Sequence, residues 1–106
     1  TVNTPILEAL AGAFAVGEGI RAVVLASEGE RAFIGGADIG EMGAIATPDM
    51  ARVFIRRISA VNTAIRACPV PVIARIQGWC LGAGLEIAAA CDLRLASERA
   101  KFGMPE

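Results

Sequence analysis

Apolar residues recur along the chain with two different spacings, and these spacings predict alternating helices and strands. In the first segment, residues 4–17, apolar side chains recur every three or four positions, which is the period of one helix face. Thr4 and Pro5 form a helix-start signal, with Thr4 as the N-cap and Pro5 as the first helical residue. Residues 21–27 then contain an unbroken apolar run, rich in β-branched side chains, that is suited to a buried strand.

A second helix-start signal stands at Thr47 and Pro48, and a long amphipathic segment follows it. Its apolar residues lie on one stripe with a period of 3.6 and are predicted to face the core: Met50, Val53, Phe54, Ile58, Val61 and Ile65. Polar residues fall off this stripe. The pattern therefore predicts one helix that begins at Thr47 and is largely buried along one face.

The prolines of residues 68–71 end that helix, because proline cannot continue a helix and favours extended geometry in the residue before it. Residues 72–76 are predicted to form a strand, residues 84–91 a short alanine-rich helix, and residues 93–96 a further strand. This alternation of helices and strands predicts an α/β layered domain.

Composition restricts the kind of protein. A chain of 106 residues forms at most one domain, yet 55% of the residues are hydrophobic. Such an excess of apolar surface indicates missing chain or buried subunit contacts. The net charge is −1, and the basic residues are scattered with no basic stripe, so we expect no nucleic-acid partner. No signal peptide and no apolar run long enough to span a bilayer is visible, so we expect no membrane partner.

Three cysteines stand in apolar contexts, at Cys68, Cys80 and Cys91, without a Cys-x-x-Cys spacing. The chain has no histidine, so no metal site is expected. An odd number of cysteines in such contexts favours reduced, buried thiols in an intracellular protein.

The most informative segment, residues 71–86, joins an apolar strand to a glycine-spaced turn that opens a helix: PVIARIQGWCLGAGLE. Glycines allow close approach of a ligand to the backbone, and the start of a helix leaves its first N–H groups without partners. These groups could bind an anion or a developing oxyanion. Another glycine turn, earlier in the chain at residues 33–39 (FIGGADI), follows another short apolar strand. In chain order we call residues 33–39 the first glycine turn and residues 82–84 the second. The chain therefore offers two candidate backbone donor sites.

Four motifs, taken in order, resemble the enoyl-CoA hydratases of the crotonase superfamily. They are AFIGGADI at 32–39, PVIARIQGWCLGAGLE at 71–86, CDLRLA at 91–96 and AKFGMPE at 100–106. The resemblance implies that residues 1–106 form part of a crotonase-like catalytic domain that binds acyl-CoA. It also implies the crotonase ββα spiral in partial form, because an initial strand and the C-terminal half of such a domain are expected to be absent.

The resemblance implies an enoyl-CoA hydratase of fatty-acid or related acyl-CoA metabolism, a lyase that adds water across the double bond of a trans-2-enoyl-CoA. The backbone N–H groups of Ala37 and Ala83 would form the oxyanion hole. The family has glycine where Ala83 stands, and alanine can supply the same N–H if the position does not need a positive φ. Glu86 would hold and activate the water, and Glu106 would deliver a proton to the α-carbon.

The remaining implications concern the substrate and the assembly. Residues Ala37, Asp38, Ile39 and Gly40 would contact the adenine end of coenzyme A through main-chain groups, and Ala83 would also contact the substrate. No separate cofactor is expected, because coenzyme A is part of the substrate. The family habit implies a homotrimer or hexamer, placed in the cytoplasm, or in the mitochondrial matrix of a eukaryote.

Other functions compete with this hypothesis. Double-bond isomerisation, or another crotonase-type reaction, can proceed with one carboxylate, and Glu106 favours hydration because it supplies a second. A dinucleotide-binding oxidoreductase would explain the glycines at 78, 82 and 84, but the acidic residue expected about 20 positions later is missing. A non-catalytic module that keeps the fold as a binding surface is opposed only by the two glutamates.

Overall fold

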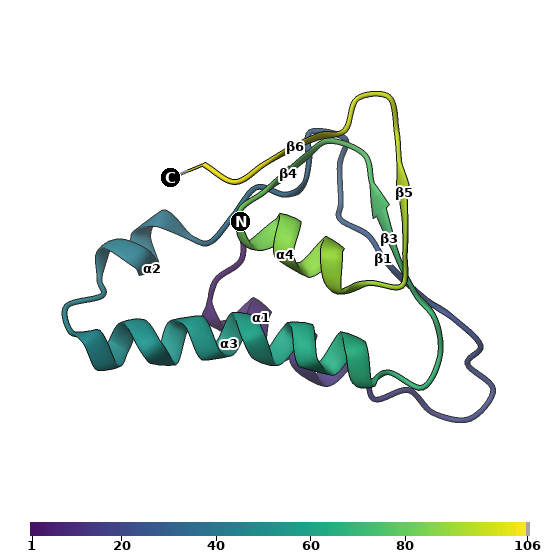
Figure 1. Ribbon diagram of the computed structural model, residues 1–106, viewed down its shortest axis with the longest axis horizontal. Helices are drawn as coiled ribbons and strands as arrows, with labels where there is room; N and C mark the ends of the chain where they lie inside the picture. The colour runs from purple at the N-terminus through teal and green to yellow at the C-terminus, as the bar shows by residue number, and fades with distance from the viewer. Residues whose placement is uncertain (106) are drawn as a thin grey trace.

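The structure of the chain is a computed structural model, and it describes residues 1–105 (Figure 1). Each of its two sheets contains three parallel strands. The elements follow one another as α1 (Thr4–Ala13), β1 (Val23–Leu25), β2 (Ala32–Ile34), α2 (Ile39–Gly43), α3 (Pro48–Ala67), β3 (Val72–Ile76), β4 (Trp79–Leu81), α4 (Ala83–Ala90), β5 (Leu93–Ala96) and β6 (Lys101–Gly103).

Two consecutive strands followed by a helical segment form the repeating unit of the fold. The first strand of each unit joins the sheet β1-β3-β5, and the second joins the sheet β2-β4-β6. The chain turns sharply between the two sheets, as Figure 1 shows where β3 leads into β4. This repeat is the ββα spiral, so the expected α/β fold class is confirmed.

The helices α1 and α3 pack against each other beneath the strands, while α4 lies between α3 and the second sheet (Figure 1). The stripe predicted for α3 is buried at Phe54, Val61 and Ile65. Met50 and Val53, near the start of the helix, remain 46% and 42% exposed. The apolar stripe therefore reaches beyond the part of α3 that the rest of residues 1–105 covers.

The start of α1 differs from the expectation. Asn3, rather than Thr4, is the N-cap, because its side-chain oxygen accepts a hydrogen bond from the N–H of Ile6 at 3.0 Å. Thr4 is already helical, and its hydroxyl is bonded to Glu41 instead. The helix also ends earlier than predicted, at Ala13. The expected N-cap at Thr47 is confirmed, since its side chain accepts from the N–H of Met50 at 3.1 Å.

Several short elements were not predicted from the sequence: β2, β4 and β6, of three residues each, and the five-residue helix α2. A three-residue strand contains too few positions to show a period. The strand β4 changes the description of the segment 71–86, because it stands between β3 and α4, so that β3 does not lead directly into the helix. The intervening strand β4 belongs to the other sheet, and it is β4 that precedes the turn into α4.

Buried thiols lie at Cys80 on β4 and at Cys91, the C-cap of α4, while Cys68 is half-buried. Burial raises the pKa of Cys80, and it raises the pKa of Cys91 to about 11. All three cysteines are free. The expected burial is therefore confirmed for Cys80 and Cys91, whereas Cys68 is only partly covered. The reduced state of the thiols stays a prediction.

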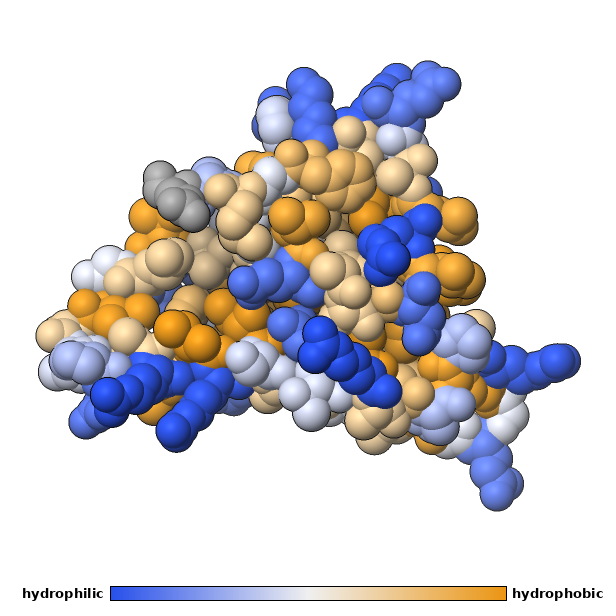
Figure 2. All heavy atoms as spheres, in the orientation of Figure 1, coloured by the Kyte–Doolittle hydropathy of each residue, from blue (hydrophilic) through white to orange (hydrophobic). Residues whose placement is uncertain are grey.

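Apolar side chains also gather on the surface. Figure 2 shows them over the end where α2 meets α3, and along the side of the molecule formed by β5. On β5, Leu93 and Leu95 are 57% and 65% exposed, and Val24 on β1 is 57% exposed. One face of the first sheet is therefore left uncovered by the described residues.

Candidate active site

The two glycine turns lie side by side because the strands before them are parallel neighbours. Ile34 at the end of β2 pairs with Cys80 in β4, so both strands deliver their following turns to the same edge of the sheet. A Cβ built on Gly82 would lie 3.9 Å from the Cα of Gly36. Segments 45 or more residues apart in sequence are thus brought into contact at their backbones.

In the second glycine turn, Gly82 and Gly84 are each required to be glycine for a different structural reason. Gly82 adopts φ 56° and ψ −118°, a conformation that side chains of L-residues disfavour. Gly84 has a helical place in α4, but a Cβ there would overlap the carbonyl oxygen of Ile34 and lie 2.8 Å from the Cβ of Ile34. The first turn of α4 therefore rests directly on the backbone of β2.

The N–H of Ala37 points away from the N-terminal segment. Val2 donates its N–H to the carbonyl of Gly36 at 2.9 Å, and Asp38 donates its N–H to the carbonyl of Val2 at 2.8 Å. In a trans peptide the C=O of one residue and the N–H of the next point in opposite directions. Because the Gly36 carbonyl faces Val2, the Ala37 N–H must face the other way. Val2 forms an isolated parallel bridge with Ala37, which lies beyond the end of β2.

Ala83 is the first residue of α4, where a backbone N–H has no partner within the helix. Among residues 1–105, neither the Ala83 N–H nor the Ala37 N–H donates to a protein acceptor. The positive φ of this turn falls on Gly82, and no alanine among the described residues has a positive φ. The condition under which alanine can replace the usual glycine is therefore met. The convergence of the two N–H groups on one oxygen stays a prediction.

Glu86 lies one turn inside α4, three residues after Ala83, so the two residues share one face of the helix. Its N–H donates to the carbonyl of Gly82 at 3.2 Å, which closes the first helical turn. Its side chain is exposed, and within residues 1–105 its carboxylate makes no ion pair. The carboxylate is thus held on a short, well-anchored helix next to the glycine turn.

The second predicted carboxylate, Glu106, lies outside the described residues. The strand that leads toward it, β6, pairs with β4 and ends at Gly103, opposite Leu81. The N–H of Gly82 donates to the carbonyl of Gly103 at 3.0 Å, so β6 ends beside the second glycine turn.

The segment predicted to contact coenzyme A begins the short helix α2. Asp38 is its N-cap, and its side chain accepts from the N–H of Glu41 at 2.8 Å. The Asp38 N–H is already used by Val2, whereas Ile39 is 82% exposed and Gly40 is exposed. The contact of this segment with a ligand stays a prediction.

An apolar groove of about 340 Å³ lies between α2 and α3. Its apolar lining comes from the loop before α3 and from the first turns of α3. Charged side chains also line the groove. The lining residues are Glu41, Ala44, Ile45, Asp49, Met50, Val53, Phe54 and Arg57. The groove therefore begins on the same helix that follows the first glycine turn.

Comparison with known proteins decides the family. Residues 2–106 match the family model described as Enoyl-CoA hydratase/isomerase. The chain belongs to this family. It is 42% identical to the short-chain-enoyl-CoA hydratase of Clostridium acetobutylicum over 87 residues, which are 82% of this chain and 33% of that protein. It is 40% identical to the human mitochondrial methylglutaconyl-CoA hydratase, with 82% of this chain and 25% of that protein covered.

Solved structures of the family give the same result for the fold. A crystal structure of an enoyl-CoA hydratase/carnithine racemase from Magnetospirillum magneticum superposes with a TM-score of 0.93 at 39% identity, covering 99% of this chain and 41% of that one. Enoyl-CoA hydratase from Bacillus anthracis gives 0.92 at 33% identity, with 97% and 41% covered. The chain thus spans a quarter to a third of these curated relatives and about two fifths of these structures.

Two further features of the site region could not be found from the family motifs alone. Val2 forms the bridge that orients Ala37, and Glu41 bonds to Thr4, 37 residues away in sequence. A local signal did exist for α2, because Asp38 and Glu41 have the spacing of a capping box.

In the part of the chain that the structure describes, no helix has both the length and the apolar character of a membrane span.

Proposed function

We propose that the protein is an enoyl-CoA hydratase that adds water across the double bond of a trans-2-enoyl-CoA thioester. The observation that carries the proposal is the contact between the two glycine turns, which brings the backbones of Gly36 and Gly82 together at the edge of one sheet. Membership of the enoyl-CoA hydratase/isomerase family and the similarity to named hydratases support the same reaction.

The first chemical requirement of hydration is stabilisation of the thioester oxygen, which gains enolate charge when water attacks. The N–H groups of Ala37 and Ala83 would donate to that oxygen. Fixed donors in a site with little water stabilise a developing charge strongly, because they need no reorganisation during the reaction. The Ala37 N–H points away from Val2, and the Ala83 N–H has no partner within α4. Both observations support these two groups as the donors.

The second requirement is proton transfer. Glu86 would hold and activate the attacking water, and Glu106 would deliver a proton to the α-carbon. Two carboxylates suffice for this chemistry, and the reaction needs no separate cofactor because coenzyme A is part of the substrate. The place of Glu86 on the helix face that carries Ala83 supports its role.

The remaining parts of the proposal concern substrate and assembly. The segment 37–40 would meet the adenine end of coenzyme A, and the groove between α2 and α3 would receive part of the acyl chain, since its lining is mainly apolar. The exposed apolar residues of β5 support burial of this face in the complete protein, for which we propose a homotrimer or hexamer. A place in the cytoplasm or the mitochondrial matrix would suit acyl-CoA metabolism.

The test is turnover by the full-length protein. Incubation with crotonyl-CoA and with longer trans-2-enoyl-CoA thioesters should remove the absorbance of the conjugated enoyl group, and product analysis should find the 3-hydroxyacyl-CoA. Measurable binding of these thioesters without any hydration would contradict the hydratase assignment. Conversion of a 3-enoyl-CoA to the 2-enoyl isomer in that case would instead assign the protein to double-bond isomerisation.

A further inference from the structure

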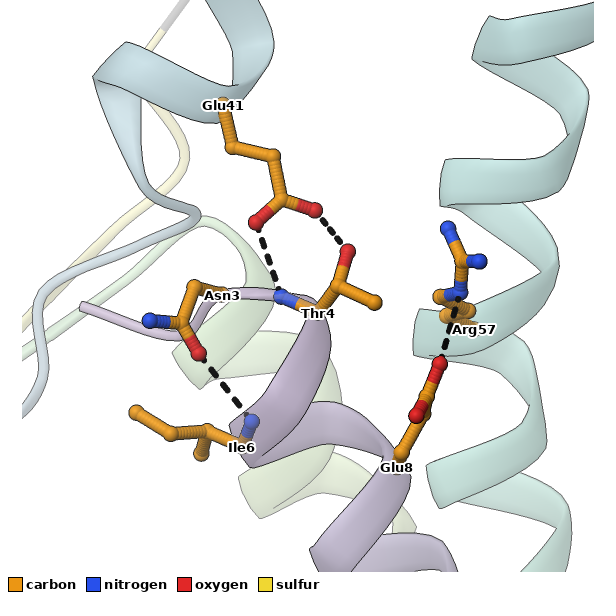
Figure 3. A network of polar contacts seen from close by, with 6 residues as sticks. All are labelled: Asn3, Thr4, Ile6, Glu8, Glu41 and Arg57. Atoms are coloured by element: carbon orange, nitrogen blue, oxygen red, sulfur yellow. Dashed lines mark hydrogen bonds and ion pairs between the residues drawn. The ribbon is translucent and has the colours of Figure 1, made fainter.

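Glu41 uses both of its carboxylate oxygens to bind the start of α1. One oxygen accepts from the backbone N–H of Thr4 at 2.8 Å, and the other accepts from the Thr4 hydroxyl (Figure 3). In an ordinary capping box, a glutamate at this place would bond back to the N-cap residue of its own helix. Here the Asp38 N–H is taken by Val2, so the Glu41 side chain is directed to another helix.

These bonds form a clamp around Ala37, which we define as the contacts of Val2 and Thr4 with residues 36–41. Val2 bonds to Gly36 on one side of Ala37 and to Asp38 on the other. Two residues later, Thr4 is fixed by Glu41. Val2 is 3% exposed, so the clamp is anchored in the core at one end. The direction of the Ala37 N–H is thereby set by the N-terminal segment.

Core packing does not hold α2 in place, since no residue of this helix is buried. Ile39 and Met42 are 82% and 50% exposed. Apart from its own cap at Asp38, the side-chain hydrogen bonds of α2 within residues 1–105 are the two that Glu41 accepts from Thr4. Loss of the Glu41 carboxylate would therefore release the helix that follows the Ala37 turn.

We propose that Glu41 is a positioning residue for the reaction: through Thr4 it fixes the first glycine turn so that the Ala37 N–H meets the thioester oxygen. This inference rests on the proposed function, because it assigns the Ala37 N–H to the oxyanion. Glu41 does not itself touch the reacting atoms. Its contribution lies in the geometry of a donor, and a misplacement of about 1 Å in such a group can cost on the order of 10²-fold in rate.

Glu41→Gln is the informative change, because the glutamine side chain keeps its size but has only one acceptor oxygen for the two Thr4 donors. We expect kcat for crotonyl-CoA hydration to fall by about 10- to 100-fold, with KM changed less than roughly threefold, since the lost interaction acts in the transition state. The loss should be the same for longer thioesters. Thr4→Val, which removes only the hydroxyl, should lower kcat less, and Thr4→Ser should keep the wild-type rate.

Matched controls separate positioning from stability. Glu8→Gln removes a carboxylate on α1 that pairs with Arg57 at 3.4 Å and does not touch the turn (Figure 3). Asn3→Ala removes the N-cap of α1 beside the clamp. Both should leave kcat within about twofold of wild type, even where Asn3→Ala lowers the melting temperature, because a cap contributes about 1 kcal/mol to stability.

The carbonyl stretching frequency of a bound, isotopically labelled thioester gives a readout that stability alone would not move. Wild-type protein should lower this frequency by polarising the carbonyl, and Glu41→Gln should lower it less. Equal losses of kcat in Glu41→Gln and Asn3→Ala, an unchanged carbonyl frequency, or a loss confined to KM for long acyl chains would each overturn the positioning role. Absence of hydration by the wild-type protein would instead refute the proposed function.

Discussion

Replacing Glu86 with glutamine is expected to lower kcat for enoyl-CoA hydration by about 10²-fold or more, because the change removes a group that acts as a base in the transition state. Binding of the thioester should weaken far less, since the side chain keeps its size on an exposed position of α4. Steady-state kinetics with crotonyl-CoA, together with a binding titration of a non-reactive acyl-CoA, measure the two effects separately.

The companion variant Glu106→Gln tests the second carboxylate in the same assay and should also lower kcat by on the order of 10²-fold. The two losses need not be equal. Glu98→Gln is the matched control, because Glu98 is an exposed residue between β5 and β6. If Glu106→Gln left hydration intact while Glu86→Gln abolished it, a mechanism with one carboxylate would replace the one proposed here.

Gly84→Ala is expected to be strongly destabilising, because it adds a methyl group where the structure leaves no room for one. The added Cβ would overlap the carbonyl oxygen of Ile34, which is backbone and cannot move aside without shifting β2. The variant should therefore lose about 3 kcal/mol of stability, at the upper end for overpacking, and most of its activity. Chemical unfolding with two structural probes measures the first effect, and crotonyl-CoA turnover measures the second.

Gly12→Ala provides the control for this change. Gly12 lies in α1, and a Cβ there would meet nothing within 4 Å. Alanine is the better helix former by up to about 1 kcal/mol, so this variant should be as stable as wild type or slightly more so. A Gly84→Ala variant that unfolds like Gly12→Ala would show that α4 does not rest on β2 as described.

Much of the fold could be predicted from the sequence because its longer elements have clear periods and boundaries. The stripe from Phe54 to Ile65 fixes the buried face of α3, and Thr47 with Pro48 marks its start. The strand β3 was also predicted with its observed limits. The resemblance to the crotonases then supplied the ββα spiral, which the order of elements alone left as one of several α/β arrangements.

The pairing of the short strands could not be predicted, because it depends on contacts between residues far apart in sequence. Three-residue strands such as β2 and β4 carry no period, yet their parallel pairing is what brings Gly36 next to Gly82. The sequence shows the glycines at 78, 82 and 84 as a motif. Only the tertiary structure shows why glycine stands at each position. Gly82 has a positive φ, whereas Gly78 and Gly84 lie against the backbone of residues 31–34.

The most direct test of the central claim is a crystal structure of the full-length protein with an unreactive acyl-CoA thioester. The account predicts that the backbone nitrogens of Ala37 and Ala83 both lie about 2.9 Å from the thioester oxygen, and therefore no more than roughly 5 Å from each other. A thioester oxygen held by other groups, or two nitrogens much farther apart than this, would contradict the oxyanion hole and with it the proposed use of the two glycine turns.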